Sequence, residues 1–294
     1  MGDPNLLRTP GDFLLRGLAE DAPYRIAVAR TSILVHEGIR RHELPPAAAV
    51  ALARALTSVA LMAVTSKDWG RLSVQWIGRG SFGTVNADIS APGVLRGYVS
   101  GPDPVASSVP EGFGAGGLVS VIRQELDHRF SQGQVALGHR EVDEDTEAFL
   151  RQSEQVPSVL RVLVDVDAAG EVTDVVGLLL QMLPGGDPRA LKAEIVAPAL
   201  LARAVPAGLP LAELIALAAP GLPRVEWMQA VPLRWSCGCS LDRVERGVAL
   251  LGLAELDVMV EEAEVTEVRC EFCAEVYRVD VPALQRIRAE LARS

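Results

Sequence analysis

Four cysteines are the residues best suited to chemistry in this chain of 294 residues. They form two close pairs, Cys237-Gly-Cys239 and Cys270-Glu-Phe-Cys273, separated by thirty residues, and the chain has no other cysteine. Zinc prefers four soft donors at tetrahedral angles, and two close pairs on separate turns can supply them without leaving an open coordination position. The spacing therefore predicts one structural zinc ion, bound by all four thiolates when the protein is reduced.

Two other interpretations of the cysteines are open. They could be incidental buried thiols, or the second pair could be a redox motif of the thioredoxin type, which needs a strand-helix-strand setting. Residues 265–269 and 274–279 instead have the pattern of a hairpin with the second pair at its tip. Six carboxylates and no basic residue fall between 247 and 268. They are typical of a solvated helix face and argue against a zinc finger that binds nucleic acid.

The cysteines lie in a short C-terminal region, residues 233–294, which ends in a predicted helix over 282–292 with Pro282 in its first turn. A unit of about sixty residues is near the size at which a hydrophobic core alone is marginal. A structural zinc ion contributes on the order of 10 kcal/mol to the folding of such units. We therefore expect 233–294 to be a zinc-binding domain.

The region before it, residues 184–232, holds eight of the nineteen prolines. Prolines end or kink helices, so 189–205 and 211–219 are expected to form short helices that depend on packing for stability. The sequence predicts a helical linker over 184–232 that covers an apolar face of the preceding domain and is the least stable part of the chain. Its candidate buried contacts are Leu191, Ile195, Leu200, Leu214, Ile215 and Leu217.

Residues 1–183 mix strand-like and helix-like patterns, which predicts an α+β domain with antiparallel hairpins. The expected strands are 24–32, 71–77, 84–89, 117–123 and 160–166. The alanine-rich stretch 47–64 is the longest apolar segment. Because Arg54 stands in its middle, we expect a buried helix of a soluble domain and not a membrane span.

One glycine-rich motif matches the consensus sequence of a nucleotide-binding loop: Gly78-Arg-Gly-Ser-Phe-Gly83-Thr-Val85. A dinucleotide fingerprint must open a helix, yet a strand-like run follows, and a kinase loop needs a nearby lysine, yet the next one is Lys192. The motif is expected to be a hairpin turn. The four histidines show no metal-binding spacing, and no nucleophile motif occurs, so we expect no enzyme.

Composition limits the partners further. The formal charge of −10 and the pI near 5.0 oppose binding to nucleic acid, and no basic run favours a membrane surface. The N-terminal residues lack the cationic and apolar regions of a signal peptide, so a cytoplasmic location is expected. Hydrophobic residues make up 49% of the chain, which is enough for a sizeable core.

With these segments in place, the sequence resembles the heat shock protein 33 chaperone family. The specific signature is the two cysteine pairs in VPLRWSCGCSLDRV and VRCEFCAEVY. Similar segments run through the chain in the family's order: GDFLLRGLAEDAPYRIAVARTS at 11–32, RGY at 96–98, FLRQSEQVPSVL at 149–160 and GLLLQMLPGG at 177–186.

The resemblance implies a redox-regulated holdase that is inactive when reduced and zinc-bound. On oxidation it would lose zinc, unfold in part, bind unfolding proteins and form a homodimer. Disulfides are expected between Cys237 and Cys239 and between Cys270 and Cys273, because each pair is adjacent in the sequence, and the resemblance suggests that the second pair oxidises first. Tyr277 also fits the family pattern, with an expected packing role.

Two alternatives from other functional classes stay open. A constitutive zinc-ribbon module would bind its partner in both redox states, and a thiol oxidoreductase would turn over substrate disulfides.

Overall fold

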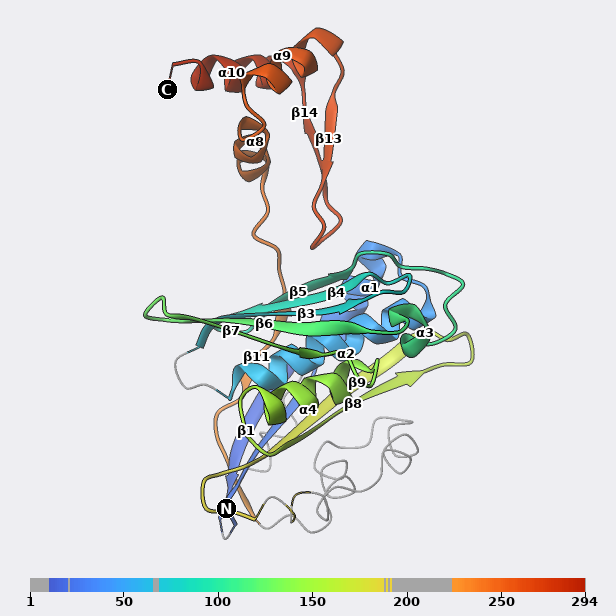
Figure 1. Cartoon of the computed structure of the whole chain (residues 1–294), viewed down its shortest axis with the longest axis vertical. Coiled ribbons are helices and arrows are strands. Elements are labelled where there is room, and N and C mark those ends of the chain that lie inside the picture. Colours follow the sequence, from blue (N-terminus) through green and yellow to red (C-terminus); the bar gives the residue numbers. More distant parts are fainter. Residues whose placement is uncertain are drawn as a thin grey trace. The chain divides into compact units, whose positions relative to one another are not determined.

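The computed structural model describes residues 11–20, 22–65, 69–187, 189, 191 and 224–293. The chain divides into two compact units, residues 1–236 and residues 237–294. We call them the larger unit and the cysteine unit, and each is described by itself (Figure 1).

The larger unit contains two antiparallel sheets, with one parallel pair at an edge. The first sheet has the order β10-β1-β2-β9-β8, and β11 also pairs with β1. Its strands are β1 Phe13–Ala19, β2 Tyr24–Arg30, β8 Ser158–Val166, β9 Val172–Met182, β10 Val225–Trp227 and β11 Val231–Pro232.

The second sheet has the order β12-β5-β4-β3-β6-β7, in which β12 runs parallel to β5. Its strands are β3 Trp69–Gly78, β4 Thr84–Ser90, β5 Val94–Val99, β6 Gly117–Glu125, β7 Phe130–Ala136 and β12 Arg234–Trp235.

Helix α2, Pro46–Ala63, lies between the two sheets and forms the centre of the core (Figure 1). Fifteen of its eighteen residues are buried, as expected for a helix that is apolar on every side. It has the length and hydropathy of a membrane span, yet 83% of that stretch is buried inside the protein. The other helices of this unit are α1 Ser32–His42, α3 Val109–Phe113 and α4 Val142–Gln152.

The α+β prediction is confirmed, and each strand expected before residue 183 has a counterpart in the two sheets. The glycine-rich motif is the turn that joins β3 to β4 as a hairpin, as predicted. Residues 225–227 and 231–232 are strands, although they fall in the range predicted as a helical linker. Leu191 is buried against the first sheet. The other predicted linker contacts, from Ile195 to Leu217, lie outside the described residues.

The cysteine unit consists of a two-stranded hairpin and three helices. Its elements are α8 Leu241–Ala249, α9 Leu253–Glu262, β13 Thr266–Arg269, β14 Val276–Val279 and α10 Val281–Leu291. Its buried core consists of six apolar residues: Val248, Leu256, Val279, Ala283, Leu284 and Ile287. So small a core gives little stabilisation by burial alone.

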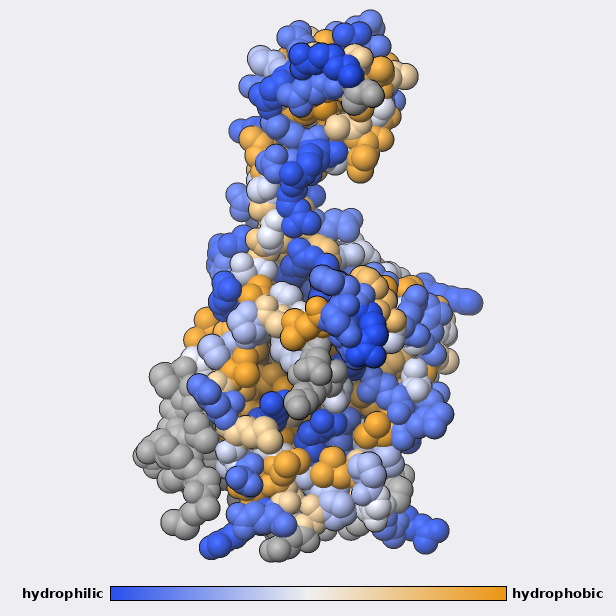
Figure 2. All heavy atoms as spheres, turned by 90° about the vertical axis from the view of Figure 1, so that its left-hand side faces the viewer, coloured by the Kyte–Doolittle hydropathy of each residue, from blue (hydrophilic) through white to orange (hydrophobic). Residues whose placement is uncertain are grey.

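On the face of the larger unit shown in Figure 2, apolar residues lie in several areas that hydrophilic residues border. In the cysteine unit, Leu250 and Leu251 after α8 and Leu253 at the start of α9 are exposed.

Candidate metal centre

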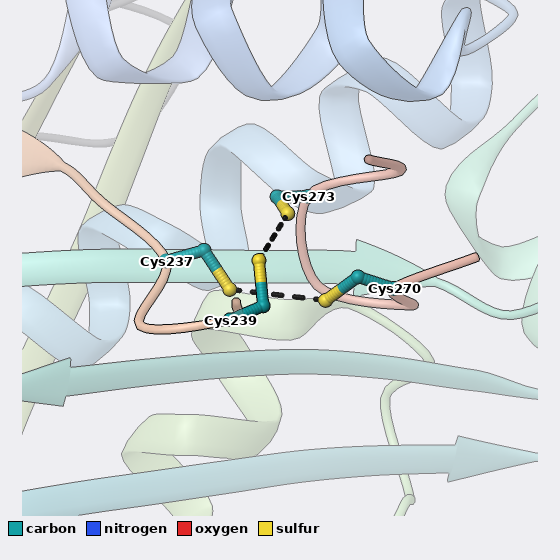
Figure 3. A group of neighbouring side chains, drawn as sticks. All are labelled: Cys237, Cys239, Cys270 and Cys273. Atoms are coloured by element: carbon teal, nitrogen blue, oxygen red, sulfur yellow. Dashed lines mark hydrogen bonds between the residues drawn. The ribbon is translucent and has the colours of Figure 1, made fainter. Parts of the chain in front are cut away.

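Two turns of the cysteine unit bring the four cysteines together. Cys237 and Cys239 lie in the extended segment before α8, and Cys270 and Cys273 lie in the turn between β13 and β14. In Figure 3 the four side chains converge, so that their sulfurs face one another. The predicted hairpin with the second pair at its tip is present, with Val268 paired to Tyr277 and Arg269 paired to Val276.

Local sequence holds each turn in place. Ser240 caps α8 by accepting a hydrogen bond from the amide of Arg243. The Arg243 guanidinium donates to the carbonyl of Gly238 at 2.8 Å, which ties the first pair to the helix. In the second turn, the amide of Ala274 donates to the carbonyl of Cys270 at 2.8 Å, and the amide of Cys270 donates to the carbonyl of Glu275 at 2.9 Å.

The sulfurs form a compact cluster of free thiols. All four lie within 4.8 Å of one another. The Cys237 and Cys270 sulfurs are 3.8 Å apart, and those of Cys239 and Cys273 are 3.3 Å apart. In a tetrahedron of four thiolates around zinc, the sulfurs are separated by about 3.8 Å. The cluster therefore has the donor type, the donor number and the approximate size of a closed zinc site.

These two contacts join cysteines from different pairs. In a tetrahedral cluster each sulfur is a neighbour of the three others. The contacts between Cys237 and Cys270 and between Cys239 and Cys273 are therefore compatible with disulfides inside each pair. Both distances also greatly exceed the bonded sulfur separation of about 2.05 Å.

Burial and backbone amides act on the second pair in opposite directions. Burial raises the pKa of the Cys270 thiol above its ordinary value of 9.0, and it raises the pKa of Cys273 further. The amides of Phe272 and Cys273 donate to the Cys270 sulfur, and the amide of Glu275 donates to that of Cys273. These amides favour the thiolate form, but without a cation at the centre burial has the larger effect.

Tyr277 has a role that the sequence did not indicate. Its hydroxyl donates a hydrogen bond to the Cys239 sulfur at 3.0 Å, so it does more than pack. The pairing of Val268 with Tyr277 places this side chain beside the cluster. The sequence pointed to Tyr277 through its position four residues after Cys273, which fits the family pattern, but not to this hydrogen bond.

The four histidines belong to the larger unit, whereas the four cysteines belong to the cysteine unit. His36 contacts the carbonyl of Val172 at 2.7 Å, His42 packs its ring edge-on to Trp235, and His139 lies 3.3 Å from Glu144. Among the residues described, the four cysteines are the group whose side chains are arranged to hold a metal ion.

Comparison with known proteins identifies the family of this chain. The sequence profile of the Hsp33 protein family matches residues 12–280. A 33 kDa chaperonin from Bacillus licheniformis is 32% identical over 290 residues, which cover 95% of this chain and 100% of that protein. A 33 kDa chaperonin from Desulforamulus reducens is 34% identical over 288 residues, covering 94% of this chain and 97% of that one.

The fold is similar to that of a solved relative. The crystal structure of the 33 kDa chaperonin from Thermotoga maritima superimposes with a TM-score of 0.78 at 23% identity, covering 96% of this chain and 99% of that one. From the profile match over most of the chain and the identity to full-length relatives, we conclude that this chain belongs to the Hsp33 family of chaperones.

Proposed function

We propose that this protein is a redox-regulated holdase: inactive while reduced and zinc-bound, and able to bind unfolding proteins once its cysteines are oxidised. The observation that carries the proposal is the cluster of four free thiols within 4.8 Å, in a unit whose buried core has six residues. Cys237, Cys239, Cys270 and Cys273 would hold the zinc ion, and the bound ion would cross-link the two turns of the cysteine unit.

Oxidation removes this cross-link by consuming the donors. Two thiolates transfer two electrons to a peroxide, the sulfurs join as a disulfide, and the peroxide leaves as two hydroxide ions. We propose the pairs Cys237 with Cys239 and Cys270 with Cys273. Metal binding and folding are coupled in units with so small a core. Loss of the four donors is therefore expected to unfold the cysteine unit.

We propose three functional regions: a chaperone core over 1–183, a linker over 184–232 and a redox-switch domain over 233–294. The last strand of the larger unit ends at Trp235, two residues before Cys237. Unfolding of the cysteine unit is thus expected to affect the segment directly before it. Unfolding proteins of the cytoplasm would be the clients, a homodimer would form on oxidation, and no catalytic activity is assigned.

The test is an aggregation assay with a denatured protein, followed by light scattering. Reduced, zinc-loaded protein is expected to leave aggregation unchanged, and peroxide-treated protein is expected to suppress it. Suppression of equal strength in both states would favour a constitutive zinc module instead. Turnover of substrate disulfides would favour an oxidoreductase.

A further inference from the structure

One short segment covers an edge of each of the two sheets in the larger unit. Residues 224–236, which we call the edge segment, pair with β1 through β10 and β11 and with β5 through β12. In Figure 1 this segment, in orange, runs past both sheets of the larger unit. An uncovered edge presents a row of unpaired amide and carbonyl groups that can pair with another chain.

Main-chain hydrogen bonds hold the edge segment. The amide of Met228 donates to the carbonyl of Arg16 at 2.9 Å, and the amide of Glu20 donates to the carbonyl of Arg224 at 2.8 Å. At the second sheet, the amides of Arg234 and Ser236 donate to the carbonyls of Gly93 and Leu95, both at 3.0 Å. These bonds do not depend on which side chains the added strand carries.

The side chains of the edge segment alternate between core and solvent. Alternate residues pack against a core cluster on both sides of Gln229: Val225 and Trp227 before it and Val231, Leu233 and Trp235 after it, and Ala230 packs there as well. The residues between them are exposed, among them Glu226, Met228, Pro232 and Arg234. Such alternation is the general pattern of a strand with one buried face, so strands from many proteins share it once they unfold.

The β1 edge is shaped for a closely approaching strand. A Cβ atom on Gly17 would lie 2.5 Å from the Val225 side chain and 2.9 Å from the Glu226 carbonyl. Any side chain here would push the added strand away. Beside it, Leu18 is 37% exposed although it lies on the strand next to the edge.

We propose that oxidation frees the edge segment from β1 and β5, and that extended segments of unfolding proteins take its place by strand addition. This inference rests on the proposed holdase function and names how the client is held. Strand addition binds through the backbone and selects only for alternating apolar residues. A holdase that must accept many clients needs this low selectivity.

Peptides matching the edge segment test the proposal directly. The probe client is fluorescein-labelled lactalbumin whose disulfides have been reduced and carboxymethylated, so that it stays unfolded. A peptide with the sequence of residues 224–236 is expected to displace it from the peroxide-treated full chain. N-methylation at Met228, Arg234 and Ser236 removes three of the amide donors to the sheet edges and should weaken displacement by about tenfold or more.

The matched control is the same peptide, N-methylated at Trp227 and Trp235 instead. Amides of successive strand residues point to opposite sides, so the amides of these two residues point away from β1 and β5. This peptide is expected to compete like the unmodified one. Equal competition by both methylated peptides, or none by any peptide, would overturn strand addition while leaving the holdase intact. If the oxidised protein binds no labelled client, the holdase proposal and this inference both fail.

A photocrosslinker locates the contact on the chaperone itself. The substitution Leu18→p-benzoylphenylalanine places the label on β1, and Gln132→p-benzoylphenylalanine places it at an exposed position of β7, at the opposite edge of the second sheet. Oxidation is expected to raise client crosslinking at position 18 by about fivefold or more over that at position 132. An equal rise at both positions, or no rise at position 18, would contradict the proposal.

Discussion

The Tyr277 hydroxyl donates a hydrogen bond of 3.0 Å to the sulfur of Cys239, across the gap between the hairpin and the segment before α8. This hydrogen bond is the main cause of the raised pKa of Tyr277, which keeps the hydroxyl protonated and available as a donor. A donor at a thiolate withdraws electron density from the sulfur and lowers its nucleophilicity. The Cys239 sulfur should therefore react more slowly with oxidants than it would without Tyr277.

Replacing this donor should speed up the switch. Tyr277→Phe keeps the ring and removes the hydroxyl, so the Cys239 sulfur becomes more reactive. We expect zinc release under peroxide to be faster by on the order of threefold. A chromogenic zinc chelator in stopped flow measures this rate.

The control is Tyr98→Phe, because Tyr98 lies on β5 in the larger unit. It should release zinc at the rate of the unchanged protein. A rate for Tyr277→Phe that matches this control would show that the hydrogen bond does not protect Cys239.

Removal of one ligand should abolish stable zinc binding. Cys273 is the buried member of the cluster, so Cys273→Ser replaces a soft thiolate by a hydroxyl in a site that water reaches poorly. Purified reduced protein is expected to hold well below half a zinc ion per chain by elemental analysis.

A second variant separates loss of a ligand from general loosening of the unit. Ser240→Ala deletes the N-cap of α8 and should cost about 1 kcal/mol of stability. It leaves all four sulfurs in place and should keep its zinc. Zinc retention by Cys273→Ser, or zinc loss by Ser240→Ala, would oppose the assigned ligand set.

Zinc should make the stability of the cysteine unit depend on pH. In the absence of a cation, burial favours the neutral thiols and raises the pKa values of Cys270 and Cys273 above the ordinary value of 9.0. Zinc must displace protons from these thiols, so the folded, zinc-bound unit holds fewer protons than the unfolded chain. The stability that zinc provides is therefore lost as the pH falls.

Thermal unfolding of reduced, zinc-loaded protein, followed by circular dichroism between about pH 6 and pH 10, measures this dependence. The zinc-loaded sample should lose stability toward the acid end, and a chelator-treated sample is the control. A zinc-loaded profile that matches the chelator-treated one would contradict the coupling of thiolates to zinc.

Replacement by alanine is expected to have opposite effects on stability at two helical glycines. A Cβ atom on Gly38 in α1 would lie 2.7 Å from the ring of Trp235 and 3.1 Å from Leu52. Gly38→Ala should cost roughly 1–3 kcal/mol through overpacking and should loosen β12. Gly247 in α8 is exposed, with no atom within 4 Å of such a Cβ, so Gly247→Ala should stabilise its helix by about 1 kcal/mol.

Urea unfolding gives both free energies, and hydrogen exchange at residues 231–236 reports on β12. Two results would contradict this prediction: a Gly38→Ala variant that is more stable than the parent, or unchanged hydrogen exchange in β12. Either would show that the position of Trp235 on β12 does not depend on its close contact with Gly38.

The sequence predicted the features that local patterns encode. The cysteine spacing placed the thiols in a hairpin turn and a preceding segment, and the apolar run of alanines predicted the buried helix α2. Strands β10 to β12 were missed because they are two or three residues long and are defined by their pairing with β1 and β5, which lie far away in the sequence. The Tyr277 contact was missed for a similar reason, since it depends on the register of β13 and β14.

Helix α1 shows the same limit. Its sequence from Ser32 to His42 lacks acidic residues in its first turn, and no side chain of Thr31 caps it. Instead, the buried carboxylate of Asp12 accepts hydrogen bonds from the amides of Ile33 and Leu34. A cap supplied by a residue 21 and 22 positions before the capped amides cannot be identified from local sequence.

A peroxide titration in which zinc release and chaperone activity are read from the same sample tests the redox switch most directly. Increasing peroxide should release up to about one zinc ion per chain, and suppression of aggregation should rise in proportion to the zinc released. Reductant and added zinc should then restore the inactive state. Full suppression of aggregation before any zinc leaves, or complete zinc release with no suppression, would contradict the proposed coupling between the four cysteines and chaperone activity.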